Sequence, residues 1–147
     1  MLLLGTKNTT LQTIPAGGLL NPGTVYRRYC RKNSCGTKTF DIVGNAYSLQ
    51  HQGMYKITVS ATFTASAAGD VTLQLTENST PIPGALATET ITTADTEIRS
   101  VSFDYVVLVD SNCLLNTNSI IESISVINAS EIEINVTNFV VNIIKVV

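Results

Sequence analysis

The residue types and spacings that chemistry requires are scarce in this chain of 147 residues. His51 is the only histidine, so a Ser-His-Asp or Cys-His arrangement would have to be built around it. It lies between Gln50 and Gln52 in a predicted turn, where an exposed, non-catalytic side chain is expected. The sequence also contains no Gly-rich phosphate loop and no redox motif. We therefore expect a protein that is not an enzyme and that carries no cofactor.

Paired carboxylates do not change this expectation. Glycoside hydrolysis needs two carboxyl groups ~5–9 Å apart in a cleft, which is usually lined by aromatic rings. The chain has no Trp, and its Glu131 and Glu133 fall on the predicted solvated face of one strand. Asp95 and Glu97 lie near a loop, but the spacing typical of calcium-binding loops is absent. We predict no catalytic residues and no metal site.

Cys30, Cys35 and Cys113 form an odd set of thiols. A tetrahedral zinc site needs four ligands, and only the distant His51 could join the three cysteines. Free or partly paired thiols are the favoured interpretation. A disulfide between Cys30 and Cys35, or between Cys35 and Cys113, remains an alternative that the sequence leaves open.

Positive charge is concentrated at the start of the chain. Residues 1–40 contain six cations and no acids, whereas residues 41–147 contain three cations and eleven acids. Residues 1–36 are also rich in Pro and Gly, which predicts an extended N-terminal arm outside the folded domain of residues 37–147. The arm ends in a basic cluster formed by Arg27, Arg28, Arg31 and Lys32. This cluster either compensates the acidic domain or attaches the protein to an acidic partner; nucleic acid is not expected, because stacking aromatics are not interleaved with the charges.

From residue 37 onward, short segments of alternating apolar and polar residues predict consecutive β-strands. Residues 55–65 alternate almost without interruption, and residues 98–109 repeat the pattern. A loop is expected at residues 78–84, where two prolines occur. The predicted strands are 25–29, 39–43, 46–49, 54–65, 71–76, 85–92, 98–109, 113–115, 120–127, 131–136 and 139–147. Their number and spacing are typical of a β-sandwich or jelly roll.

The composition favours an assembled protein. Charged residues make up only 14% of the chain, although a small monomer usually carries more charge for solubility. The apolar start, residues 1–4, is too short for a signal peptide, and no segment reaches the length of a membrane span. The last segment, residues 139–147, is apolar on both faces, which predicts a strand buried between two layers or at a subunit interface.

Three segments resemble known protein families. Residues 51–57 are similar to the opening of the long strand in the tumour necrosis factor and complement globular-head superfamily. Residues 68–85 resemble bacterial collagen-like surface glycoprotein tips and small structural proteins of bacteriophages, and residues 124–147 resemble the closing strands of the same families. The resemblance covers about residues 38–147, but no Gly-x-y stalk precedes the domain and Ser79 stands where Gly is common.

This resemblance implies an all-β, ten-strand jelly-roll sandwich of the TNF-like type that assembles as a homotrimer around its final strand. Phe139, Val141, Ile143 and Val147 are then expected at the trimer contact, with Tyr55 and Phe103 as core or interface aromatics.

The function implied is that of a bacteriophage capsid decoration or head-fibre protein. It would be assembled in the host cytoplasm, displayed on the virion surface and attached through its arm to the major capsid protein or another virion protein. The alternative is a receptor- or glycan-binding tip of a fibre or of a bacterial or spore surface protein, using loops 78–84 and 110–118.

Overall fold

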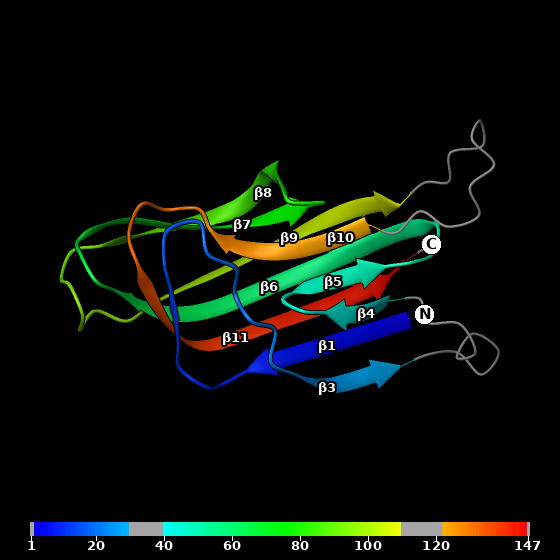
Figure 1. The fold of residues 1–147 in the computed structure, drawn as a ribbon, viewed down its shortest axis with the longest axis horizontal. Coiled ribbons are helices and arrows are strands. Elements are labelled where there is room, and N and C mark those ends of the chain that lie inside the picture. Colours follow the sequence, from blue (N-terminus) through cyan, green and yellow to red (C-terminus); the bar gives the residue numbers. More distant parts are fainter. Residues whose placement is uncertain (1, 30–39, 110–121, 147) are drawn as a thin grey trace.

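The computed structural model describes residues 2–29, 40–109 and 122–146, which form two antiparallel β-sheets packed face to face (Figure 1). Sheet A has the strand order β3-β1-β11-β6-β9, with the short β2 also paired to β11. Sheet B has the order β4-β5-β10-β7-β8. The strands are β1 (Leu2–Asn8), β2 (Gln12–Ile14), β3 (Thr24–Tyr29), β4 (Phe40–Val43), β5 (Ala46–Leu49), β6 (Gly53–Ala65), β7 (Gly69–Glu77), β8 (Thr80–Ile91), β9 (Arg99–Val109), β10 (Glu122–Asn128) and β11 (Ile134–Lys145). The predicted all-β jelly-roll sandwich is confirmed.

Alternation along the strands creates the core. Every second residue of β6, from Tyr55 to Ala65, is fully buried between the sheets, and the residues between them point away from the core. The predicted inward face of β9 is also confirmed, because Val101, Val107 and Val109 are buried and Phe103 packs against the same core. Because each long strand buries one face only, both sheets present an outward face.

The N-terminal segment belongs to the sandwich. β1 lies between β3 and β11, with Leu4 paired to Ile143 and fully buried. The Thr6 and Tyr47 hydroxyls share a buried hydrogen bond of 2.7 Å that joins sheet A to sheet B. The prediction of an extended arm over residues 1–36 is therefore wrong for residues 2–29.

A second contact explains why this segment folds back onto the domain. Leu20 is almost completely buried, and its N–H donates to the Val126 carbonyl at 2.9 Å beside β10. The prolines and glycines between the strands form turns, as at Gly17 and Gly23, both of which have φ of +77°. The breakers in this segment thus mark strand connections within the domain.

Two predicted boundaries also differ from the structure. Pro81 and Pro83 lie inside β8, because β8 is the edge strand of sheet B, where missing N–H donors are tolerated. The predicted strands 131–136 and 139–147 are one strand, β11, with a bulge between Val136 and Asn138. Within the described residues, no helix is long and apolar enough to cross a membrane.

Candidate assembly surface

The outward face of sheet A combines small polar residues with an apolar end. Across β6 and β9, Met54 lies opposite Leu108, and Lys56 lies opposite Val106. Ile144 of β11 is the neighbour of Lys56 on the other side. Leu108 is 62% exposed and Val106 is 46% exposed, so apolar surface is left uncovered in the protomer. We call Met54, Val106, Leu108 and Ile144 the apolar end of sheet A.

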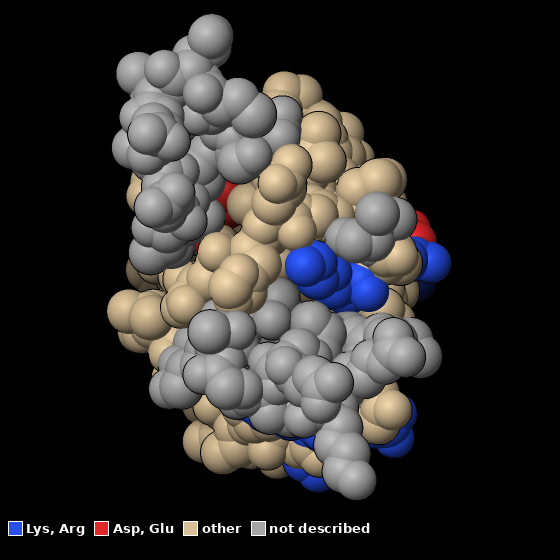
Figure 2. Space-filling model, turned by 90° about the vertical axis from the view of Figure 1, so that its right-hand side faces the viewer, with Lys and Arg blue, Asp and Glu red and all other residues tan. Residues whose placement is uncertain are grey.

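Over β6 and β9, charge on this outward face is sparse and paired. The Lys56 ammonium lies 3.3 Å from a carboxylate oxygen of Asp104, on the neighbouring strand. Farther along the same face, the facing pairs are Ser60 with Ser102 and Thr62 with Ser100. The β6 and β9 part of the face is therefore close to neutral. Figure 2 looks onto the end of the sandwich where β6 begins and β9 ends, and most of the described surface there is uncharged.

The outward face of sheet B satisfies its polar groups internally. Thr76 and Ser125 are buried and hydrogen-bond to each other through their hydroxyls. Thr72 and Thr88 form another cross-strand hydroxyl pair at 2.8 Å. Leu86, 41% exposed on β8, is an exposed apolar residue of this face. This layer needs no partner to satisfy these hydroxyls.

The structure places the predicted trimer residues differently from the expectation. Four of them are almost completely buried by sheet B within a single protomer, and so offer no surface to a second copy: Tyr55, Phe139, Val141 and Ile143. Phe103 is partly buried against the core, and Val147 lies outside the described residues. The trimer prediction is wrong for Phe139, Val141 and Ile143, whereas Tyr55 is a core aromatic, one of the two places expected for it. The outward set that alternates with them on β11 includes Val140 and Ile144, which are half-buried.

The β3 edge of sheet A displays an aromatic ring between cations. The Tyr26 ring centre is 5.7 Å from both the Lys7 ammonium and the Arg27 guanidinium carbon. Its hydroxyl donates to Asn142 Oδ1 at 2.7 Å, across Gly5 of β1. A Cβ at Gly5 would lie 2.9 Å from the Tyr26 ring, so the ring requires a glycine beneath it. Tyr26 thereby ties β3 to β11.

Only part of the predicted basic cluster can be located. Arg27 and Arg28 lie on β3, and all six residues of that strand are exposed. Arg31 and Lys32 lie outside the described residues, as do Cys30, Cys35 and Cys113, whose pairing stays a prediction. The described part of the cluster is thus a basic sheet edge.

Groups suited to catalysis or metal binding do not gather in the described residues. Among them, no cluster of three or more His, Cys, Asp or Glu side chains could hold a metal ion. His51 lies half-buried in the turn before β6, where its carbonyl accepts the Tyr55 hydroxyl at 2.6 Å. Burial raises the pKa of Tyr55 to about 12, despite this hydrogen bond. The turn thus anchors the start of β6.

Glu97 organises the loop between β8 and β9. Its carboxylate accepts the backbone N–H groups of Thr92 and Thr93, the latter at 2.9 Å. Its other oxygen receives Arg99 at 2.7 and 3.0 Å. The Thr93 N–H, followed by Arg99 and the Thr92 N–H, lowers the pKa of Glu97 to about 2. This carboxylate therefore acts as a loop anchor.

Several solved structures share this arrangement across almost the whole chain. The globular domain of zebrafish complement 1qA matches with a TM-score of 0.64 at 10% identity, covering 100% of this chain and 98% of that chain. The Eiger TNF of S. frugiperda matches with a TM-score of 0.58 at 10% identity, covering 99% and 91%. The PRD1 vertex protein P5 matches with a TM-score of 0.54 at 12% identity, covering 99% and 97%. No protein-family model and no curated protein matches the sequence. These likenesses identify the fold as the TNF-like jelly roll of complement globular heads and tumour necrosis factors.

Proposed function

We propose that this protein is a non-enzymatic structural component of a virion that assembles as a homotrimer through the outward face of sheet A. The observation that carries the proposal is the apolar end of sheet A, exposed beside the β6 and β9 part of the face, where Lys56 and Asp104 pair with each other. Apolar area removed from water contributes about 25 cal/mol per Å², against which association entropy must be set. Because the charges on β6 and β9 are paired, contact through these two strands avoids most of the desolvation cost of burying isolated charges.

The likeness to a vertex protein supports the role in a particle. P5 is named as a vertex protein of PRD1, and its likeness to this chain extends over 99% of the residues. The sequence resemblance to small bacteriophage structural proteins supports the same role. We propose display at the virion surface, as a decoration or head-fibre protein of a bacteriophage capsid.

Attachment to the particle is proposed through the basic edge of sheet A. Arg27 and Arg28 are exposed on β3, and Arg31 and Lys32 follow in the sequence. An acidic surface on the major capsid protein or another virion protein would complement this edge. Such a contact is weakened by salt, because exposed charges are screened within about 10 Å at 0.1 M ionic strength.

Sedimentation of the full chain over a range of concentrations tests the assembly. We expect a particle of three 15.8 kDa chains. Leu108→Asp should dissociate it, because a carboxylate would be buried in the apolar end. Leu86→Asp is the matched control on sheet B and should leave the mass unchanged. A monomeric wild type, or equal behaviour of the two variants, would contradict the proposed contact face.

Attachment is tested separately on particles from the source. Arg27→Glu and Arg28→Glu should each reduce co-sedimentation with particles while the trimer persists. Lys145→Glu makes the same charge change at the end of β11 and is the control. Undiminished decoration by both β3 variants would refute attachment through this edge.

A further inference from the structure

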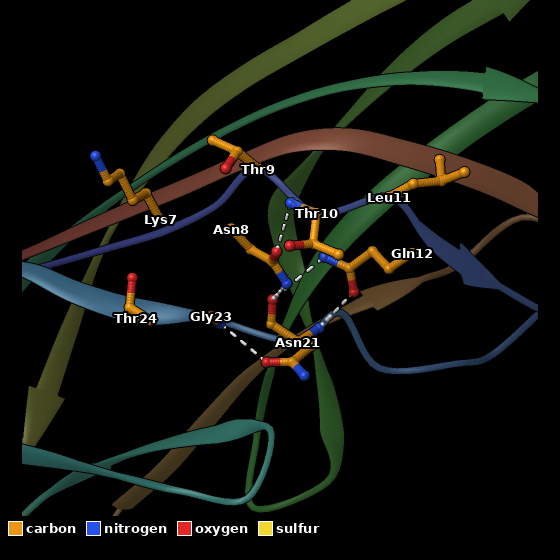
Figure 3. Close-up of a pocket in the computed structure, with 9 residues that line it drawn as sticks. All are labelled: Lys7, Asn8, Thr9, Thr10, Leu11, Gln12, Asn21, Gly23 and Thr24. Atoms are coloured by element: carbon orange, nitrogen blue, oxygen red, sulfur yellow. Dashed lines mark hydrogen bonds between the residues drawn. The ribbon is translucent and has the colours of Figure 1, made fainter.

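A polar hollow lies between the loop after β1 and the turn before β3. Its volume is about 570 Å³, within the range of small-molecule sites. Figure 3 shows the residues that surround it, among them Lys7, Asn8, Gln12, Asn21 and Gly23. Neither the fold nor the proposed assembly assigns any role to this hollow.

Three amide side chains in the hollow have their oxygen atoms occupied. Asn8 Oδ1 accepts the Thr10 N–H at 3.0 Å, and Gln12 Oε1 accepts the Asn21 N–H at 2.8 Å. Asn21 Oδ1 accepts the Gly23 N–H at 2.9 Å. Because a backbone N–H can only donate, these bonds fix which end of each amide is oxygen.

The nitrogen ends of the same amides retain donors for a ligand. Asn8 Nδ2 and Gln12 Nε2 each give one hydrogen to the Asn21 carbonyl, at 3.1 and 3.2 Å, and each has a second hydrogen left. Asn21 Nδ2 has no hydrogen-bond partner within the described part of the chain, and Figure 3 shows it without one. The amides of this hollow therefore offer unused N–H donors, while each of their oxygens already accepts one hydrogen bond.

The charge at the hollow is positive, which also suits a ligand with oxygen acceptors. The Lys7 side chain lies at the rim, and its ammonium has no ion pair among the described residues. None of the nine lining residues is acidic. The Thr9, Thr10 and Thr24 side chains belong to the lining, and Leu11, 61% exposed, adds an apolar side chain. The unused N–H donors and the Lys7 charge favour a ligand with oxygen acceptors and negative charge.

We propose that this hollow binds an acidic saccharide, with its carboxylate near Lys7 and its ring oxygens facing the amide nitrogens of Asn8, Gln12 and Asn21. A sugar ring supplies many oxygen acceptors and a C–H face that can pack on Leu11. An inorganic anion could contact the Lys7 ammonium, but it would fill little of the hollow and leave most of the amide N–H donors without partners. The inference is independent of the proposed virion role and can be tested on the isolated protein.

Nuclear magnetic resonance titration of the ¹⁵N-labelled full chain with D-glucuronate, D-glucose and sulfate is the test. We expect glucuronate to shift the amide signals of Thr10 and Gly23, and to bind about tenfold more tightly than glucose or sulfate. Asn21→Asp keeps the oxygen that accepts the Gly23 N–H but replaces the donor with a carboxylate. This variant should weaken glucuronate binding by at least tenfold.

Controls make the outcome decisive. Asn45→Asp adds the same charge at an exposed turn between β4 and β5, and should bind glucuronate like the wild type. If Asn21→Asp fails to fold, Lys7→Gln at the exposed rim replaces it and should weaken glucuronate binding about tenfold. Equal binding of sulfate, shifts confined to other surfaces, no binding of glucuronate, or full binding by the variant at the hollow would each overturn the proposal.

Discussion

The outward faces of sheets A and B are built from similar small polar residues but differ in what they leave uncovered. On sheet B, the Thr76–Ser125 and Thr72–Thr88 hydroxyl pairs satisfy one another across neighbouring strands. On sheet A, hydroxyl residues give way at one end to exposed Val106 and Leu108. Polar content alone therefore does not distinguish the two faces. Uncovered apolar area beside neutralised charge is the more informative property.

The largest effect on stability is expected on the inward side of β11, and a much smaller one on its outward side. Ile143 is fully buried and Ile144 is half-buried on the outward face. Ile143→Ala should lower the free energy of unfolding by about 2–5 kcal/mol, because it leaves a cavity in the core. Ile144→Ala should cost the protomer far less and instead raise the trimer dissociation constant. Chemical denaturation and sedimentation of both variants measure the two effects, and a large stability loss for Ile144→Ala would break the distinction.

An intermediate effect is expected for hydroxyl pairs on the two sheets. Thr76→Val leaves the buried Ser125 hydroxyl without its partner and should cost about 1–3 kcal/mol in urea denaturation. Thr62→Val breaks the 2.9 Å Thr62–Ser100 hydroxyl pair on sheet A, where solvent replaces the lost bond. Its cost should stay within about 0.5 kcal/mol. Similar costs for both variants would mean that sheet A is as self-contained as sheet B.

The smallest effect concerns the loop that connects sheet B to sheet A. The hydrogen bonds of Glu97 hold its pKa at about 2 in the folded protein, below the usual 4.5. The ionised carboxylate therefore stabilises the fold above pH 4.5, and this contribution is lost as the pH falls from 4.5 toward 2. Glu97→Gln should flatten the acid side of the thermal stability profile. Glu133→Gln is the control, since that carboxylate takes part in none of the hydrogen bonds of the loop; an unchanged profile in Glu97→Gln would contradict the assignment.

The fold could be predicted wherever a strand buries one face and exposes the other. Residues 55–65 and 98–109 alternate for that reason, and both strands lie where the pattern indicates. The sequence did not predict β1 because two of its outward positions are not polar. Leu3 is apolar and half-buried there, and Gly5 has no side chain, which leaves room for the Tyr26 ring. The alternation of apolar and polar residues is therefore absent from this strand. Such masking depends on packing between distant segments, which local sequence does not reveal.

The candidate sites were harder to predict than the fold. The closing strand is apolar on both faces, so its sequence does not show which of its two alternating sets of residues is available for the proposed trimer contact. Which set faces sheet B is decided by tertiary packing, and the set containing Phe139 lies inside. The polar hollow was missed because Asn, Gln and Thr between residues 8 and 24 also suit turns. Asn8, Gln12 and Asn21 occur in a segment that contains no acidic residue, and this could have indicated a binding site. Only the structure shows which of their amide atoms already form hydrogen bonds.

The pairing of β1 with β11 has a consequence for biosynthesis. These are the first and last described strands, and their residues lie more than 130 positions apart, as in the Leu4–Ile143 pair. Sheet A cannot close around its central strands while residues 134–145 are still inside the ribosome. In the nascent chain β1 can pair with β3, but its edge that binds β11 stays unpaired until residues 134–145 emerge, and contacts this distant also slow the final collapse. Sheet A is therefore completed late, after its closing segment emerges, and the proposed trimer contact on its outward face can form only then.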